Sequence, residues 1–229
     1  MEDILVSGRA SFQIEVPYKL IETGKKEEKP LIIYLHGFNQ NLKIAEEQFS
    51  LLKDLEAYHL YIQAPYPIYD RSRKKKLEDW GRAWYLYDGE ADTFIESMEA
   101  ASSFIQQILD RLTQNIDVNR VAVVGYSMGG YLAGYFAFTR WKHVIDVVVI
   151  GGRIKTEPFE DRFHHLKHLN ILALHGKHDK RVEKSNQERS VEKLIDQGLN
   201  AEFRVIDGKH ELTDTYIREA KHWLTDLGY

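Results

Sequence analysis

The ten residues Val121–Gly130, VAVVGYSMGG, constrain the fold of this chain more than any other segment. A strand-forming run, Val121–Val124, leads into the pattern Gly-x-Ser-x-Gly, and the helix-forming run Tyr131–Phe138 follows it. A strand that turns this sharply into a helix strains the backbone of Ser127 and exposes its hydroxyl at the helix N-terminus. Backbone N–H groups there can stabilise a developing negative charge. Ser127 is therefore a candidate nucleophile, and a glycine-rich turn with an incidental serine is the alternative.

Strand-like and helix-like segments alternate along the rest of the chain. Apolar patterns predict further strands at Phe12–Val16, Leu31–Leu35, His59–Gln63, Val144–Ile150, Asn170–Leu174 and Ala201–Ile206. Helical spacing predicts helices at Leu42–Leu55, Asp92–Asn115, Lys184–Gln197 and Thr213–Leu227, with an irregular segment at 64–91. The alternation predicts an α/β fold, with a mostly parallel central sheet and helices on both faces. The length fits one large domain or two small ones, and we expect a single domain over residues 1–229.

Composition argues against several classes of protein. The net charge of −4 gives no general case for nucleic-acid binding. The chain has no cysteine, which excludes disulfides, thiolate metal sites and a cysteine nucleophile. The acidic start at Glu2 and Asp3 does not resemble a signal peptide, and the apolar runs are too short to span a bilayer. We therefore expect a cytoplasmic protein without a membrane span, a cofactor or a bound metal.

Two predicted strands downstream of Ser127 are each followed by residues that could activate it. A serine hydroxyl is a weak nucleophile unless a base, usually a histidine oriented by a carboxylate, takes its proton. Such groups meet beyond the C-terminal ends of parallel strands, in the chain order serine, acid, histidine. Asp179 follows one predicted strand and His210 follows the last. We predict His210 to be the base and Asp179 to be the acid.

Other assignments stay open for these loops. The alternative for His210 is an ordinary surface histidine, and the alternative for Asp179 is a turn residue that caps the next helix. Glu183 and Asp207 are the fallback acids, although Asp207 is close in sequence to His210. The rival histidines, which precede the acid and so break the expected order, are His175 and His178.

An oxyanion site needs two N–H donors close to the serine. Met128, the residue after Ser127, is expected to supply the first. The loop after Leu31–Leu35 reads HGFNQ, and its glycine lets the backbone approach closely. We expect the N–H of Phe38 to supply the second donor. His36 is interpreted as a structural residue that braces this loop.

Four motifs together resemble the α/β-hydrolase superfamily. They are LHGF at 35–38, GYSMGG at 125–130, GKHD at 176–179 with Val182, and GKHEL at 208–212. Their spacing and short connections resemble the small phospholipase/carboxylesterase branch, which includes acyl-protein thioesterases. The segment RAWY at 82–85 is similar to an aromatic segment near the acyl site of that branch. The resemblance covers about residues 30–225.

The resemblance implies a three-layer α/β-hydrolase domain without a large separate lid. It implies a serine esterase or thioesterase with Ser127, Asp179 and His210 as its triad, and a small-molecule ester or thioester as substrate. The chain departs from the family pattern at Lys209, which separates a glycine from His210, and at Met128, where the family often has glutamine. Neither departure removes a catalytic atom, because Met128 still supplies its backbone N–H.

The irregular segment 65–91 is the expected wall of a substrate pocket. Its aromatic residues combine apolar area with polar tips, and Trp84 and Tyr85 are the candidates for an acyl or aromatic pocket. Ordinary packing of a long loop is an equal alternative for both. The basic run Arg71–Lys76 could attract an anionic substrate, but a solvated loop tip is favoured. His164, His165 and His168 could suggest a metal site. No acidic or cysteine partner lies at a useful spacing, so we interpret them as a surface cluster.

Three hypotheses about function fit these residues. The first is a serine hydrolase that cleaves carboxyl esters or thioesters of small to medium acyl groups through an acyl-enzyme. The second is an aminopeptidase or amidase on the same scaffold. The third is a binding protein that has kept the fold and lost catalysis.

Overall fold

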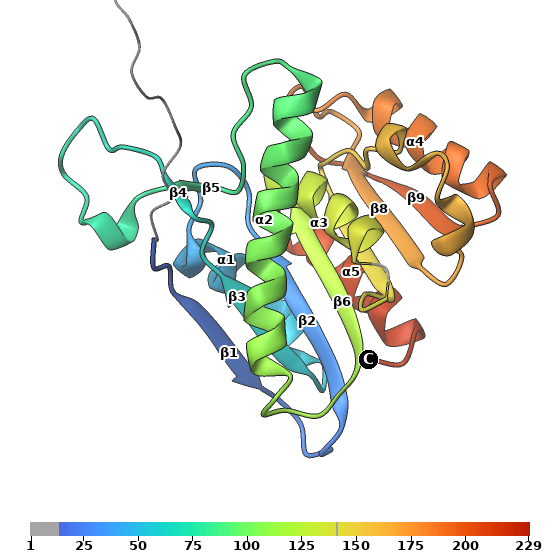
Figure 1. Ribbon diagram of the computed structural model, residues 1–229, viewed down its shortest axis with the longest axis horizontal. Helices are drawn as coiled ribbons and strands as arrows, with labels where there is room; N and C mark the ends of the chain where they lie inside the picture. Colours follow the sequence, from blue (N-terminus) through green and yellow to red (C-terminus); the bar gives the residue numbers. More distant parts are fainter. Residues whose placement is uncertain (1–13, 141) are drawn as a thin grey trace, which may run out of the picture.

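A central sheet of seven strands dominates the structure, a computed structural model that describes residues 14–140 and 142–229. The strands lie in the order β1-β3-β2-β6-β7-β8-β9 (Figure 1). β1 pairs antiparallel with β3, and every other pair is parallel. The strand bounds are β1 Tyr18–Glu22, β2 Lys29–Leu35, β3 Tyr58–Ile62, β6 Val118–Tyr126, β7 Asp146–Ile150, β8 Asn170–Gly176 and β9 Asn200–Ile206.

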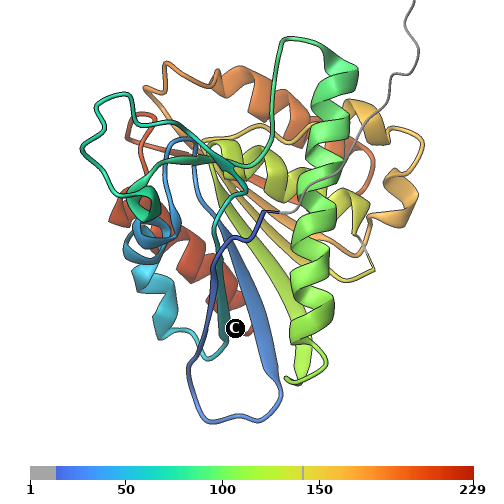
Figure 2. The same cartoon turned by 60° about the vertical axis from the view of Figure 1, so that its left-hand side comes forward.

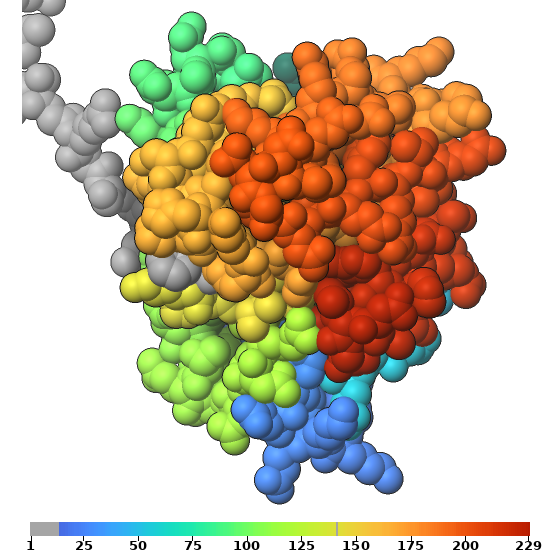
Figure 3. Space-filling model, turned by 90° about the vertical axis from the view of Figure 1, so that its right-hand side faces the viewer, coloured from blue at the N-terminus to red at the C-terminus, as the bar shows by residue number. Residues whose placement is uncertain are grey.

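Helices cover both faces of this sheet. One face carries α2 (Ala91–Leu112), α3 (Met128–Thr139) and α4 (Lys184–Asp196). The other carries α1 (Leu42–Gln48), the 3-10 helix η1 (Ser50–Asp54) and α5 (Asp214–Asp226). Figure 2 shows the sheet between the two helical layers, and Figure 3 shows how α4 and α5 form much of one side of the molecule. The predicted three-layer α/β fold is confirmed.

The continuous apolar strands arise because both of their faces are buried. In β2, Leu31 and Ile33 pack into the core with α2 and α3, whereas Ile32 and Tyr34 pack into the core with α1 and α5. The same alternation holds in β7, where successive valines face opposite cores. Burial on both faces therefore explains why the parallel strands show no polar alternation.

Two predicted segments differ from the observed elements. The predicted helix Leu42–Leu55 is interrupted at Phe49, which is fully buried and caps α1 before η1 begins. The predicted strand Phe12–Val16 is wrong over residues 14–16, and residues 12 and 13 lie outside the described residues. The register pairs Tyr18 with Ile62, so residues before Tyr18 run past the end of β3. Strand pairing, not local alternation, sets where β1 begins.

The irregular segment 64–91 is tied to the loop that follows β2. Within it, β4 (Tyr66–Pro67) pairs antiparallel with β5 (Arg82–Ala83), with the short 3-10 helix η2 (Leu77–Asp79) between them. An isolated bridge joins Gln40 to Arg82. Figure 1 shows the teal loop between β4 and β5 projecting away from the sheet. Among residues 14–140 and 142–229, no helix is both long and apolar enough to cross a bilayer.

Candidate active site

The turn between β6 and α3 carries Ser127. Its φ of 51° and ψ of −115° lie in a region that non-glycine residues rarely adopt. A Cβ atom on Gly125 would lie 2.1 Å from the carbonyl oxygen of Gly129, and a Cβ atom on Gly129 would lie 2.1 Å from that of Leu35. Glycine at both positions lets α3 start directly against β6 and the end of β2. The serine is therefore held in a strained turn of the kind its motif predicts.

Ser127, His210 and Asp179 form a continuous chain of hydrogen bonds. Ser127 Oγ lies 2.8 Å from His210 Nε2, and His210 Nδ1 lies 2.8 Å from Asp179 Oδ2. The Asp179 side chain is fully buried, and the His210 side chain is 10% exposed. With Nδ1–H donating to the carboxylate, Nε2 is left to accept the serine proton. The structure thus brings together, from the loops after β6, β8 and β9, the three residues singled out as nucleophile, acid and base.

The carboxylate of Asp179 is fixed by backbone donors as well as by His210. Its Oδ1 accepts hydrogen bonds from the N–H groups of Arg181 at 2.8 Å and Val182 at 3.0 Å. Burial acts to raise the pKa of Asp179, but the hydrogen bonds from Val182, His210 and Arg181 outweigh it and lower the pKa below its usual value. Asp179 is therefore ionised. Its Oδ1 accepts from the backbone of the turn, and its Oδ2 accepts from His210.

A second histidine, His175, reaches the same carboxylate. Its Nε2 lies 3.3 Å from Asp179 Oδ2 and 3.0 Å from the carbonyl oxygen of Val182. The side chain is fully buried, and burial lowers its pKa below the usual value against the opposing effects of Val182 and Asp179. His175 is thus neutral and donates from Nε2. Sequence reasoning considered His175 only as a rival base, because its contact with the acid depends on where β8 ends.

The loop after β2 leaves one backbone donor without an acceptor. The N–H of Gly37 donates to Gln40 Oε1 at 2.7 Å, and the N–H of Gln40 donates to the Gly37 carbonyl at 3.3 Å. The N–H of Asn39 donates to the Arg82 carbonyl at 3.0 Å. Among the described residues, nothing accepts from the N–H of Phe38.

The other expected donor belongs to Met128, the first residue of α3. Backbone N–H groups at this position have no partner within their own helix. Gly129 packs against the backbone carbonyl groups of Leu35 and His36, so the start of α3 lies directly beside the loop after β2. Two donors from different elements are therefore available near Ser127.

His36 and Trp84 brace this loop from behind. His36 is fully buried, and its Nδ1 donates to the Gly37 carbonyl at 2.8 Å while its Nε2 accepts from Ala64 N–H at 3.2 Å. Burial lowers the pKa of His36 to about 4, so the ring is neutral. Trp84 Nε1 donates to the His36 carbonyl at 2.8 Å. Trp84 is also fully buried, which makes it a support of the loop.

A cavity of about 550 Å³ lies next to the start of α3. Tyr131, which lines it, follows Ser127 by one helical turn, and its N–H donates to the Ser127 carbonyl at 3.1 Å. Tyr85 is part of the wall, whereas Trp84 is not. Its lining combines four aromatic rings with two cations that pair with an acid; these residues are Tyr85, Tyr87, Phe94, Tyr131, Arg153, Lys155 and Glu157.

A second hollow, of about 530 Å³, adjoins the histidine of the hydrogen-bonded chain. His210 lines it together with Lys180, Arg181 and Lys209, and the three cationic side chains make no ion pair among the described residues. Three cationic side chains without an acidic partner among those residues therefore line the hollow beside His210.

The remaining candidates lie apart from this arrangement. Asp207 has an 89% exposed side chain and contacts His178 at 3.3 Å. Glu183 accepts hydrogen bonds from Ser185 and Asn186. Within residues 14–140 and 142–229, no group of three or more histidine, cysteine or acidic residues could hold a metal ion.

The chain resembles known proteins in sequence and in fold. The phospholipase/carboxylesterase family model matches residues 16–227. Acyl-protein thioesterase 2 of Zea mays is 20% identical, with a TM-score of 0.72 over 92% of this chain and 98% of that one. A carboxylesterase of Bacillus cereus is 17% identical, with a TM-score of 0.72 over 92% and 94%. One of Mesorhizobium loti is 15% identical, with a TM-score of 0.74 over the same shares. The TM-scores show a shared fold, and the family match over residues 16–227 shows that the chain belongs to the phospholipase/carboxylesterase family.

Proposed function

We propose that the chain is a serine hydrolase that cleaves carboxyl esters or thioesters of small to medium acyl groups. The observation that carries the proposal is the hydrogen-bonded chain Ser127–His210–Asp179 at the C-terminal edge of the sheet. A buried, ionised Asp179 orients His210, and His210 Nε2 is positioned to take the serine proton. Membership of a family of esterases supports the same reaction class.

The proposed reaction passes through an acyl-enzyme. Ser127 Oγ attacks the acyl carbon while its proton moves to His210 Nε2, and the N–H groups of Phe38 and Met128 stabilise the oxyanion. When the oxyanion collapses, the bond to the leaving group breaks and His210 returns the proton to the departing alcohol or thiol. Water, deprotonated by His210, then attacks the acyl carbon. Collapse of the second oxyanion breaks the bond between the acyl carbon and Ser127 Oγ, and His210 returns the proton to Ser127 as the acid leaves.

The aromatic cavity beside α3 is the proposed acyl site. Tyr131, one helical turn from Ser127, lines this cavity. Tyr85, from the predicted pocket segment, forms another part of its wall. Its volume of about 550 Å³ suits a short or medium acyl group or an aromatic one. Trp84 contributes indirectly, through the hydrogen bond that fixes the loop carrying Phe38.

The cationic hollow beside His210 is the proposed exit side for the leaving group. Lys180, Arg181 and Lys209 lack acidic partners among the described residues, so their charges remain available to a ligand. A leaving group that carries negative charge would gain from their field. The proposed substrates are therefore esters or thioesters with a modest acyl group and, preferentially, an anionic leaving group.

A substrate panel tests this proposal against the amidase alternative. p-Nitrophenyl esters of increasing acyl length and matched amino-acid p-nitroanilides are offered to the wild type and to Ser127→Ala. Turnover of esters, lost in Ser127→Ala, is expected. Preferential cleavage of the anilides would favour the amidase, and turnover of neither would favour the binding protein. The single domain over residues 1–229 and the cytoplasmic location remain predictions.

A further inference from the structure

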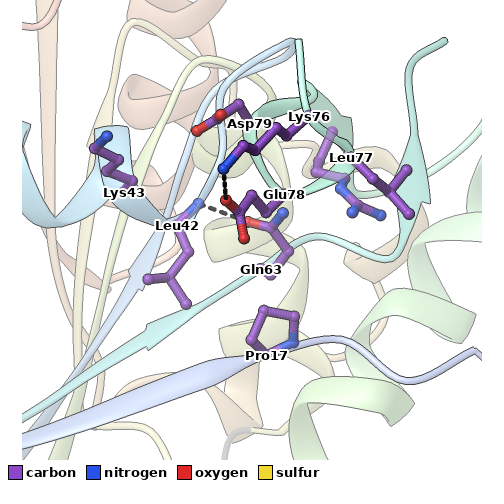
Figure 4. A pocket seen from close by; sticks show the side chains of 9 residues that line it. Pro17, Leu42, Lys43, Gln63, Lys76, Leu77, Glu78 and Asp79 are labelled. Atoms are coloured by element: carbon purple, nitrogen blue, oxygen red, sulfur yellow. Dashed lines mark hydrogen bonds and ion pairs between the residues drawn. The ribbon is translucent and has the colours of Figure 1, made fainter.

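A third cavity, of about 750 Å³, lies apart from the proposed active site. Its walls come from the start of α1, the residue after β3, and η2 with β5 (Figure 4). Ser127, Asp179 and His210 are not among its lining residues. The cavity lies at the base of the loop that carries the basic run 71–76, for which the hydrolase chemistry offers no role.

A buried arginine lines this cavity without a salt bridge to any described residue. Arg82 is 9% exposed, and its Nε is buried with no hydrogen-bond partner. Within the described part of the chain, its guanidinium makes no hydrogen bond and no ion pair. Its backbone is fixed, because Arg82 N–H donates to the Gln40 carbonyl at 2.8 Å. A buried nitrogen without a partner is unfavourable, and a guanidinium keeps its charge at any ordinary pH.

The other lining residues add a donor and charges of both signs. Gln63 is 2% exposed, and its Oε1 accepts from Leu42 N–H at 2.6 Å, which leaves its amide nitrogen as a free donor (Figure 4). Lys76 contacts Glu78 only at 3.9 Å, with both side chains more than three-quarters exposed. Such a rim pair contributes little. Neither Glu78 nor Asp79 pairs with Arg82, although both line the cavity.

We propose that this cavity binds a small organic anion, a carboxylate or a phosphate monoester with an apolar part, through the guanidinium of Arg82. The planar fork of arginine matches both oxyanions with two parallel hydrogen bonds. The amide nitrogen of Gln63 provides a further donor, and Leu42 and Leu77 provide apolar contact. This site shares none of the catalytic residues of the proposed hydrolase reaction, although the backbone of Arg82 is hydrogen-bonded to the loop after β2.

Titration calorimetry of the full chain with phenyl phosphate and with benzoate tests the proposal. Saturable binding of at least one probe is expected, weakened about 10-fold or more in Arg82→Met, because hydrogen bonds to charged groups are strong. Arg181→Ala, which removes a cation beside His210, is the matched control and should bind as the wild type does. The tighter probe identifies the oxyanion. The proposal is overturned if binding is weakened by Arg181→Ala and not by Arg82→Met, or if neither probe binds the wild type saturably.

Thermal unfolding separates a binding residue from a structural one. Without anions, Arg82→Met should raise Tm by about 2–4 °C, because methionine keeps the packing and removes an unpaired charge. The better probe should raise the Tm of the wild type and leave that of Arg82→Met unchanged. A lower Tm in Arg82→Met, with no effect of either probe on the wild type, would show that Arg82 only supports the fold.

Discussion

His175 Nε2 lies 3.3 Å from Asp179 Oδ2, so two imidazoles lie against one carboxylate oxygen. The other imidazole is His210, whose Nδ1 lies 2.8 Å from the same oxygen. His175 also donates to the carbonyl of Val182, whose own N–H donates to Asp179 Oδ1. His175 therefore holds the turn that presents the carboxylate and packs against the carboxylate itself, which makes it a positioning residue for the proposed acid.

We expect His175→Ala to lower kcat by about 2- to 10-fold, since it removes the hydrogen bond to the Val182 carbonyl and a typical hydrogen bond contributes about 0.5–1.5 kcal/mol. KM should change little, because His175 lines neither cavity next to the proposed site. Steady-state kinetics on a p-nitrophenyl ester measure both constants, and His175→Gln, which keeps a donor, should recover part of kcat. A fall in Tm with kcat unchanged would mean that His175 serves the fold alone.

Acidification should destabilise the protein through two buried histidines. Burial lowers the pKa of both His36 and His59 to about 4. In the unfolded chain a histidine titrates near about 6.5, so only the unfolded state takes up these protons as the pH falls below that value. The free energy of unfolding should therefore drop between pH 6.5 and 4, by about 1.4 kcal/mol per pH unit for each residue.

Urea unfolding across this range measures the slope. His59→Gln, away from the proposed site, should reduce it, whereas His222→Gln should not, because the His222 side chain is 71% exposed. Equal slopes in wild type and His59→Gln would contradict the assignment.

The serine turn should tolerate no side chain at Gly129. A Cβ there would lie 2.1 Å from a backbone oxygen of Leu35, so Gly129→Ala must displace α3 or β2. We expect a loss of about 1–3 kcal/mol in stability, as for overpacked cores, with a fall in kcat. Gly134→Ala is the matched control in the same helix, where the nearest contact is an ordinary 3.4 Å. A tolerated Gly129→Ala would show that the close approach is not required.

Esters with a charged leaving group should report on the cations beside His210. An ester of 3-carboxy-4-nitrophenol is compared with its neutral p-nitrophenyl counterpart. The ratio of their kcat/KM values should fall by about 2–5-fold in Arg181→Ala, the range of exposed charge pairs, and should fall as salt is added. Lys74→Ala, in the exposed basic run, is the control. If neither Arg181→Ala nor added salt changes this ratio, the hollow beside His210 does not bind the leaving group.

Much of the fold was predictable because the parallel strands are apolar on both faces and are separated by turn signals. The two errors have physical causes. The start of β1 depends on its register with β3, which aligns Tyr18 with Ile62. The break in the predicted helix Leu42–Leu55 comes where Phe49 enters the core. Both depend on contacts between segments distant in sequence.

The candidate site was predictable where chain order and strand ends carry the information, as for Ser127, Asp179 and His210. The role of His175 was missed, because it follows from burial at the end of β8. The support that Trp84 gives to His36 spans 48 positions in sequence and leaves no local pattern. The unpaired state of Arg82 is likewise a property of packing, since its identity alone suggests a solvated surface residue.

Covalent labelling with a fluorophosphonate probe tests the central claim most directly. The account predicts stoichiometric labelling of the folded wild type at Ser127, located by peptide mass spectrometry, and loss of labelling in Ser127→Ala. Asp179→Asn should label far more slowly, because His210 would lose its orientation. Absence of labelling in folded wild-type protein, or labelling that persists in Ser127→Ala, would contradict the account.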